Sequence, residues 1–309
     1  MATTTNITTT YAGEFAGKYV SAALLSGKTL AENLITIKPN IKLKEVMKKV
    51  ATNDLVKDAT CDFDPTSTLT LTERILTPEE FQVNLQLCKK DFRSDWEAVQ
   101  MGFSAYDNLP PSFADFLIAH ASDKVAQKME QNIWNGTNAN AGEFDGFKTT
   151  LLADADVIDV AAVGGGVDSS NVVAQLGRIV DDIPSAVYGT EDLFIYVSSN
   201  IYRAYVRALG GFASNVGAAG TDNKGTQWFN GGALTYDGIN VVLASGLAAN
   251  TAVAAQKSNL FFGTGLLNDQ NEVKVIDMAD IDGSQNVRVV MRFTAGIQHA
   301  IGSDIVLYS

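Results

Sequence analysis

The chain has 309 residues, of which 46% are hydrophobic and 19% charged, and its formal net charge is −12. Length and composition fit one large or two modest folded domains and exclude a wholly disordered chain. The acidic balance argues against a protein that grips nucleic acid along its phosphates, because such proteins carry a basic face.

The N-terminus is polar and threonine-rich and lacks the basic start and apolar run of a secretory signal. We expect residues 1–10 to form a flexible arm.

No stretch reaches the ~20 apolar residues that span a membrane. Cys61 and Cys88 could form one disulfide, but the expected cytoplasmic site of synthesis favours two reduced thiols.

Two lysine-containing segments precede residue 57. The run from Ala22 to Thr29, AALLSGKT, matches a relaxed phosphate-loop pattern, but it lacks the first glycine and no strand precedes it. We therefore expect a helix end at Ser26–Gly27 and keep nucleotide binding as a remote alternative. Residues 41–50 carry four lysines, which we interpret as the solvated face of a helix, with a polyanion site as the alternative.

The next region alternates apolar with polar residues. The apolar positions of this alternation include Leu69, Leu71, Phe81, Val83 and Leu85. A period of two predicts two strands, which we expect to form a long hairpin over residues 66–87. Because an isolated two-stranded ribbon is marginal in water, we expect another chain to bury its apolar side chains.

A long helix is predicted from Ser112 to Asn135. Ser112 is a good N-cap after two prolines, and Asn135–Gly136 is a C-terminal stop. Apolar residues recur every four positions between them: Phe113, Leu117, Ala121, Val125, Met129 and Ile133. The helix would span roughly 35 Å at 1.5 Å per residue and form the spine of the fold.

The second half mixes helices with many strands. Helices are predicted at about 170–183 and 201–209, and strands at 193–197, 233–236, 239–243, 260–262, 273–276, 287–293 and 305–308. Asp237–Gly238 predicts a hairpin turn. Residues 210–232, rich in glycine and small residues, are expected to be a long surface loop. The order predicts an α+β fold.

Signatures of chemistry are sparse. The two histidines, His120 and His299, carry no hydrolase or zinc-protease motif around them, and no paired Cys-x-x-Cys is present. Four aspartates, Asp154, Asp156, Asp280 and Asp282, could bind a cation only if the fold brought them together. We therefore predict no catalytic residue, no cofactor and no metal.

Several segments resemble the major capsid proteins of tailed bacteriophages, particularly those of crAss-like phages. They are LTLTERILTP at 69–78, VNLQLCKKDF at 83–92, DWEAVQM at 95–101, the helix end NIWNG at 132–136, and the closing strands from Val289. The resemblance covers roughly residues 50–309. It implies the HK97-like capsid fold, with an N-terminal arm, an extended loop, a peripheral domain containing the spine helix, and an axial domain.

The resemblance also implies a division of the chain. The expected parts are an arm and leading segment (1–57), an extended hairpin loop (58–90), a peripheral domain with the spine helix (91–150), an axial domain (151–270) and closing peripheral strands (271–309). Contacts between subunits would involve Leu69, Leu71, Phe81, Val83 and Leu85 of the hairpin and Gly210, Gly211 and Gly231 of the loop at the symmetry axes.

The implied function is structural. Such a chain would assemble as pentamers and hexamers into an icosahedral virion shell around double-stranded DNA. It would be made in the host cytoplasm, with scaffolding, portal and decoration proteins as expected partners. Two alternatives stay open: an encapsulin-type compartment, which shares the fold, and a nucleotide-binding enzyme.

Overall fold

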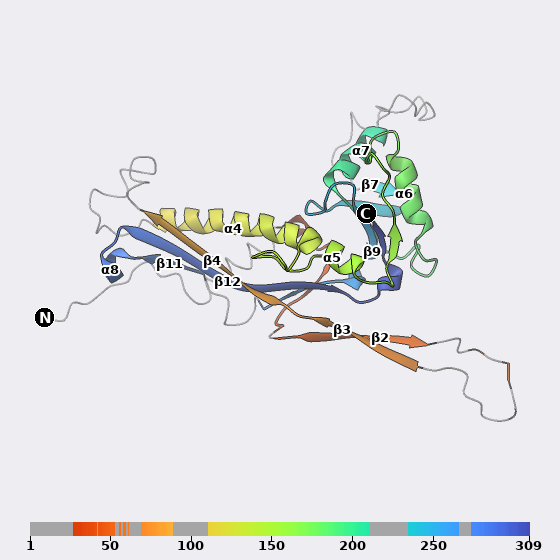
Figure 1. The fold of residues 1–309 in the computed structure, drawn as a ribbon, viewed down its shortest axis with the longest axis horizontal. Helices are drawn as coiled ribbons and strands as arrows, with labels where there is room; N and C mark the ends of the chain where they lie inside the picture. Colours follow the sequence, from red (N-terminus) through yellow and green to blue (C-terminus); the bar gives the residue numbers. More distant parts are fainter. Residues whose placement is uncertain are drawn as a thin grey trace.

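The computed structural model describes residues 27–41, 43–52, 56, 58, 59, 61, 69–88, 111–209, 234–265 and 273–309. Within them the chain forms two sheets and one projecting two-stranded ribbon (Figure 1). The helices are α2 (Lys28–Ala31), α4 (Pro111–Asn135), α5 (Phe147–Leu152), α6 (Val172–Asp181), α7 (Ser199–Leu209) and α8 (Ala279–Asp282), with 3-10 turns η1 (Lys257–Asn259) and η2 (Gly302–Asp304).

The first sheet has five strands and carries the long helix. Its order is β1 (Thr36–Lys38), β10 (Leu260–Thr264), β12 (Asn286–His299) and β11 (Val273–Asp277), and β4 (Glu79–Cys88) also pairs with β12. Helix α4 lies along this sheet (Figure 1). Side chains along β12 point alternately to the two faces of the sheet, and those that face inward are buried.

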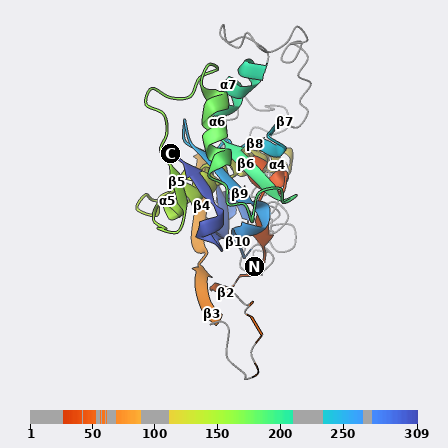
Figure 2. The ribbon, with the colours of Figure 1, turned by 90° about the vertical axis from the view of Figure 1, so that its right-hand side faces the viewer.

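The second sheet has six strands in the order β5 (Ile158–Val160), β13 (Val306–Tyr308), β9 (Ala252–Gln256), β6 (Leu193–Val197), β8 (Ile239–Leu243) and β7 (Leu234–Tyr236). Figure 2 shows helices α6 and α7 beside this sheet, at the end of the molecule opposite the ribbon. The apolar stripe of α6, with Leu176 and Ile179, is fully buried in the core of this domain.

The C-terminal end of α4 lies where the two sheets meet. Trp134 is fully buried and its ring centroid is 5.0 Å from that of Tyr196 on β6. The Tyr196 hydroxyl donates a 2.6 Å hydrogen bond to the carbonyl of Leu34, and burial raises the pKa of this phenol. One core cluster therefore contains residues of both sheets and of the N-terminal segment.

Several predicted elements are confirmed. Helix α4 ends at Asn135 as expected, and β6 matches the predicted buried strand at 193–197. The β7–β8 hairpin turns through Asp237 and Gly238, whose φ angles are 51° and 82°. Positive φ at both central residues is what a tight type I′ turn requires, so the Asp-Gly signal was informative.

The predicted hairpin over residues 66–87 is wrong in its pairing. The ribbon is formed by β2 (Glu45–Thr52) and β3 (Leu69–Leu76), which pair along eight residues, while β4 pairs with β12 along ten. The chain does not reverse between β3 and β4. Each strand finds its partner elsewhere: β4 pairs with β12 in the sheet that carries α4, and β3 pairs with β2.

The ribbon pairing also corrects the predicted helix at residues 41–50, because residues 45–52 form a strand. Sheet membership does not follow the predicted division of the chain at several strands, among them β4, β10 and β13. β4 belongs to the five-stranded sheet and not to the ribbon, β10 belongs there and not with the six-stranded sheet, and β13 belongs to the six-stranded sheet. The sheet to which each strand belongs is set by pairing with strands far along the chain, and this pairing cannot be read from the order of elements in the sequence.

A close backbone approach provides a test of the contact between α4 and the six-stranded domain. A Cβ atom at Gly246 would lie 1.9 Å from the Glu130 carbonyl oxygen, whereas one at Gly164 would meet nothing within 4 Å. We expect Gly246→Ala to lower the free energy of unfolding by about 1–3 kcal/mol, because overpacking forces the two segments apart.

The measurement is chemical denaturation followed by circular dichroism, with Gly164→Ala as the matched control, which should be near neutral. Equal stability of the two variants would show that α4 and the Ser245–Gly246 segment do not pack as described.

Candidate functional site: the ribbon, its root and the α4–β4 groove

The β2–β3 ribbon carries an exposed apolar face. Residues that alternate along a strand, and those directly opposite across a pair, share a face. Val46 lies opposite Ile75, and Leu71 and Leu69 continue the same face. Their relative exposures are 45% for Val46, 43% for Ile75, 63% for Leu71 and 64% for Leu69. The described residues of this chain leave that face uncovered.

The root of the ribbon is packed against the five-stranded sheet. On the opposite face, Met47 and the fully buried Leu76 join Ile41 in a small cluster against Phe261 of β10. Lys38 forms an ion pair with Glu45 and lies 5.1 Å above the Phe261 ring. The two faces of the ribbon therefore differ: one anchors the ribbon and the other is free to bind.

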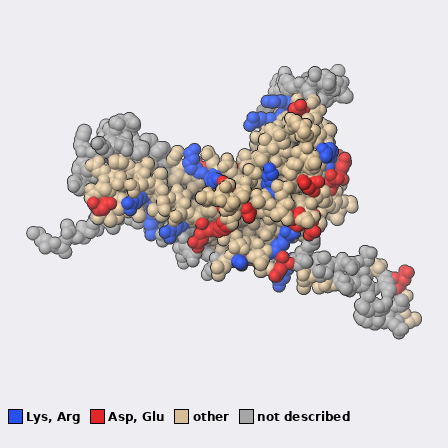
Figure 3. Space-filling view, in the orientation of Figure 1, with Lys and Arg blue, Asp and Glu red and all other residues tan. Residues whose placement is uncertain are grey.

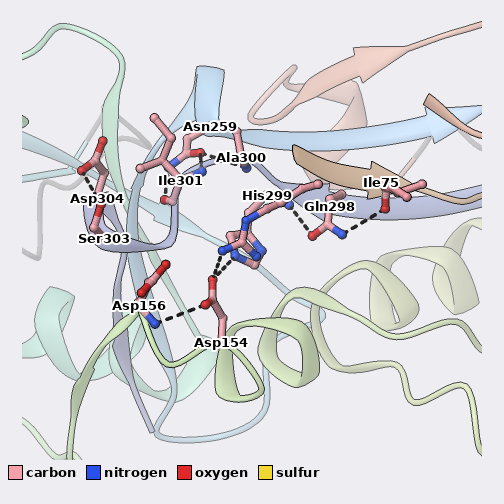
Figure 4. Close-up of polar contacts among 11 residues, drawn as sticks. Ile75, Asp154, Asp156, Asn259, Gln298, His299, Ala300, Ile301, Ser303 and Asp304 are labelled. Atoms are coloured by element: carbon pink, nitrogen blue, oxygen red, sulfur yellow. Dashed lines mark hydrogen bonds and ion pairs between the residues drawn. The ribbon is translucent and has the colours of Figure 1, made fainter. Parts of the chain in front are cut away.

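A glycine lets β12 pass close to the link between ribbon and body. A Cβ atom at Gly296 would lie 2.9 Å from both the Pro78 Cα and the Thr77 carbonyl oxygen. Two positions along, the Gln298 side chain donates a 3.2 Å hydrogen bond to the Ile75 carbonyl (Figure 4). These contacts fix where the chain leaves the sheet and becomes the ribbon.

A polar cluster of one buried and two partly buried side chains completes the root. Asp154, in the turn after α5, accepts hydrogen bonds through the same oxygen from Arg74 of β3 and from His299 at the end of β12. The His299 Nε2 to Asp154 Oδ2 distance is 2.7 Å, and Figure 4 shows Asp154 lying between His299 and the backbone of Asp156. The cluster joins the ribbon, the five-stranded sheet and the entry to β5.

Burial and hydrogen bonding act against each other on these groups. Burial alone would raise the pKa of Asp154, but hydrogen bonds from His299, the Asp156 backbone and Arg74 outweigh it, and the pKa lies below its usual value. Burial lowers the pKa of His299, and the contact with Asp154 only partly offsets this. We infer that a neutral imidazole donates to an ionised carboxylate.

This His–Asp pair has a structural place at the ribbon root. His299 is fully buried, and its Nδ1 atom has no hydrogen-bond partner. A general base needs its free nitrogen within reach of a nucleophile or water. The described residues present neither to Nδ1, and the observed contacts of the pair tie β3 to β12 and to the turn after α5.

The root should make the fold sensitive to mild acid. Below the ordinary histidine pKa of 6.5 the unfolded chain takes up a proton that the folded chain resists, so the free energy of unfolding falls as the pH drops. The lowered pKa of Asp154 adds a further loss only toward pH 3.8 and below. Between pH 6.5 and 5 we expect His299 to contribute a slope of at most about 1.4 kcal/mol per pH unit.

Denaturation curves at a series of pH values measure this slope. His299→Gln should remove the histidine contribution and flatten the profile in that window. His120→Gln, which replaces the exposed histidine of α4, is the matched control. A His299→Gln profile as steep as wild type would contradict the assignment.

The groove between α4 and β4 was not foreseen from the sequence. It has a volume of about 700 Å³ and lies beside the ribbon's own continuation into the sheet. Its lining is almost wholly apolar and includes Phe81, Val83, Leu85, Ala121, Val125 and Met129. The sequence showed both the apolar stripe of α4 and the alternation of β4. It did not show that the helix and the strand would be separated by a groove.

The sequence-predicted contact residues fall into three groups. Leu69 and Leu71 lie on the exposed ribbon face. Phe81, Val83 and Leu85 lie on β4, half-buried against the core beneath α4, so they are not ribbon residues as expected; their contact with another subunit stays a prediction. Gly210, Gly211 and Gly231 lie outside the described residues.

The remaining chemical alternatives find little support in the geometry. The Thr29 amide and hydroxyl both donate to the Glu130 carboxylate, at 3.0 and 2.6 Å, and Trp134 donates to the same hydroxyl. A carboxylate thus occupies the amide and hydroxyl that a phosphate would need. A helix, α2, begins after Gly27 where a helix end was expected.

Metal and membrane sites were also considered. Within the described ranges, no group of three or more His, Cys, Asp or Glu side chains is placed to hold a metal ion, and Asp154 is taken up by Arg74 and His299. Cys61 and Cys88 are not bonded to each other. None of the described helices has the length and apolar character to cross a membrane.

Comparisons with known proteins address the fold. No protein-family model and no curated protein matches the sequence. Among solved structures, the capsid of the native GTA particle, with C5 symmetry, aligns over 93% of this chain and 89% of its own, with a TM-score of 0.60 and 14% identity. The chain has the HK97-like capsid fold.

Other structures with this fold align over similar lengths. A structure of Mycobacterium phage Che8 covers 97% of this chain and 92% of its own, with a TM-score of 0.53 and 10% identity. The procapsid of satellite phage P4, which includes a size determination (Sid) protein, covers 94% and 98%, with a TM-score of 0.54 and 11% identity. The fold expected from the resemblance is confirmed.

Proposed function

We propose that this chain is the major capsid protein of a tailed bacteriophage. It assembles as pentamers and hexamers into an icosahedral shell around double-stranded DNA, and it works as a structural subunit and not as an enzyme. The observation that carries the proposal is the apolar face of the β2–β3 ribbon, projecting from a body with the HK97-like fold.

The ribbon face supports assembly on energetic grounds. Complete burial of an aliphatic side chain stabilises by about 1.5–3 kcal/mol. Val46, Leu69, Leu71 and Ile75 are each about half exposed, so a neighbour that covered them would gain about 1 kcal/mol from each. Each contact is modest, and a closed symmetrical shell repeats it at every subunit.

The parts of the chain take corresponding roles in this proposal. The ribbon is the extended loop, α4 is the spine helix of a peripheral domain, and the six-stranded sheet with α6 and α7 is the axial domain. Residues 210–232, with Gly210, Gly211 and Gly231, would meet their copies at the symmetry axes. Scaffolding, portal and decoration proteins would be the partners, and the chain would be made in the host cytoplasm and reside in the virion.

An encapsulin-type compartment is the alternative that shares this fold. The compared structures come from phages and GTA particles, which favours the virion. The contents of particles purified with the neighbouring genes distinguish the two. Nuclease-protected double-stranded DNA inside the particles would support the capsid proposal. An enclosed protein cargo without DNA would support an encapsulin-type compartment instead.

Leu71→Asp tests the ribbon. We expect at least a tenfold rise in the protein concentration needed for assembly, because the substitution removes apolar contact and places a charge where it would be desolvated. Light scattering and negative-stain electron microscopy measure assembly. The monomer should unfold at the wild-type temperature, since Leu71 is 63% exposed.

Val173→Asp is the matched control. Val173 is an exposed residue of α6, which lies at the end of the molecule opposite the ribbon (Figure 2), and it is 45% exposed, so the same change of charge should leave assembly close to wild type. Normal shells from Leu71→Asp would remove the ribbon from the proposal.

A further inference from the structure

We infer that two copies of the chain join through opposite flanks of the six-stranded domain, with Arg203 and Arg207 of one copy bound in an acidic cleft of the next. The inference rests on the proposed function, because it assigns residues to the contact between neighbouring axial domains. The arginines project from α7, and the cleft lies between the segment before β6 and the β7–β8 turn.

One face of α7 carries two exposed arginines. Arg203 and Arg207 are four residues apart and exposed, whereas Tyr205 between them is buried in the domain. Like charges at this spacing disfavour a helix. The helix dipole favours Arg207, which lies in the last turn, but offers no such reason for Arg203. Neither guanidinium has a partner among the described residues, so this face presents two cations to solvent.

The segment that follows α7 does not supply the missing negative charge. Residues 210–233 contain one acid, Asp222, and one base, Lys224. Their formal charges cancel, so this segment cannot neutralise two arginines. A partner that neutralises both must bring at least two carboxylates, and the chain carries such a set elsewhere on the same domain.

The acidic cleft has a volume of about 380 Å³, and its lining includes Tyr188, Glu191 and Asp237. The Tyr188 hydroxyl donates to Asp237 Oδ2 at 3.4 Å, and the nearby Asp237 carboxylate raises the pKa of this phenol. Burial raises the pKa of Tyr236, and Asp237 and Asp181 both add to the rise, so the Asp181 carboxylate lies close by. Among the described residues no Lys or Arg pairs with these three carboxylates.

A guanidinium fits this cleft chemically, because its planar fork donates to two carboxylate oxygens at once. The Asp237 carboxylate is held on a tight turn, with φ of 51° at Asp237 and 82° at Gly238. Glu191 lies beside it in the same cleft. Leu193 and Ile239 also line the cleft and offer an apolar wall to the methylene stem of an arginine.

The arginines and the cleft lie on opposite flanks of the domain. β6 and β8 run parallel, and the cleft lies at their first residues, Leu193 and Ile239, whereas α7 begins beyond the last residue of β6. In Figure 1, α7 lies on the left of this domain and α6 on the right. Figure 3 shows basic side chains gathered on the α7 side and acidic side chains on the side beyond α6. The arginines of a copy therefore face away from its own cleft.

Opposite flanks make a head-to-tail contact, in which each copy gives its arginines to the next and receives those of the previous one. Contacts of this kind generate rings when the rotation closes. A two-fold contact would set arginines against arginines, which repel each other. Phosphates of enclosed DNA are the other anions in the proposed shell. The acidic cleft favours a second copy, because DNA would complement only one of the two flanks.

Charge reversal on each flank tests the contact. The arginine variant is R203E/R207E, and the cleft variant is D181K/E191K, which leaves the constrained turn at Asp237 intact. Each should need roughly tenfold more protein than wild type to form rings and shells, because like charges then face each other. Sedimentation velocity and negative-stain electron microscopy measure this. The two variants change the net charge in opposite directions, so a loss shared by both does not come from net charge.

The combined variant R203E/R207E/D181K/E191K carries both reversals and has the wild-type net charge. Its flanks are again opposite in sign, so we expect it to regain assembly close to wild type. R203K/R207K keeps both positive charges on α7 and is the matched control, which should assemble close to wild type. All four substituted positions are exposed, so the monomers should unfold at the wild-type temperature.

The outcomes separate this inference from the proposed function. Normal assembly of either reversed variant, or a combined variant that fails to regain assembly while wild type forms shells, would overturn the pairing of the flanks and leave the proposed function standing. Normal shells of R203E/R207E that lack protected DNA would assign the arginines to DNA instead. Wild type that forms neither rings nor shells, with the neighbouring genes present, would overturn the proposed function itself.

Discussion

The hydrogen bonding of β12 is the constraint on which the rest of the structure depends. This strand pairs with β4 and β11 along its first part and with β10 along its last part, and the chain then enters β13 of the other sheet. Its inward side chains form the floor under α4, and His299 at its end reaches Asp154. Helix, ribbon root and second domain are therefore all positioned relative to one strand.

The ribbon root shows how a binding element can be held firmly and still present an open face. Leu76 and Met47 fill a small apolar cluster, and Arg74 is tied to the partly buried Asp154 carboxylate, which His299 also contacts. Alternation along β3 sends Arg74 and Leu76 to one side and Leu69, Leu71 and Ile75 to the other. The eight residues of β3 thus contain both anchoring side chains and an exposed apolar face.

Local patterns predicted the elements well, and pairing less well. The four-residue spacing of apolar side chains located α4, and Asp237–Gly238 located the β7–β8 turn, because both depend on nearby residues only. The partners of β3 and β4 depend on strands far along the chain, so alternation at Phe81, Val83 and Leu85 indicated a strand without revealing its sheet. The groove and the Arg74–Asp154–His299 cluster depend on the same long-range pairing and had no local signal.

The continuity of β3 with β4 has a mechanical consequence. A neighbour that pulls on the ribbon pulls along the axis of β4, and that strand is joined to β12 by ten consecutive residue pairs. Tension in this direction slides one strand past the other, so the load is shared by all ten pairs at once instead of opening them one by one. In the proposed shell, the subunit would therefore transmit stretching force from a neighbour into the middle of its own sheet.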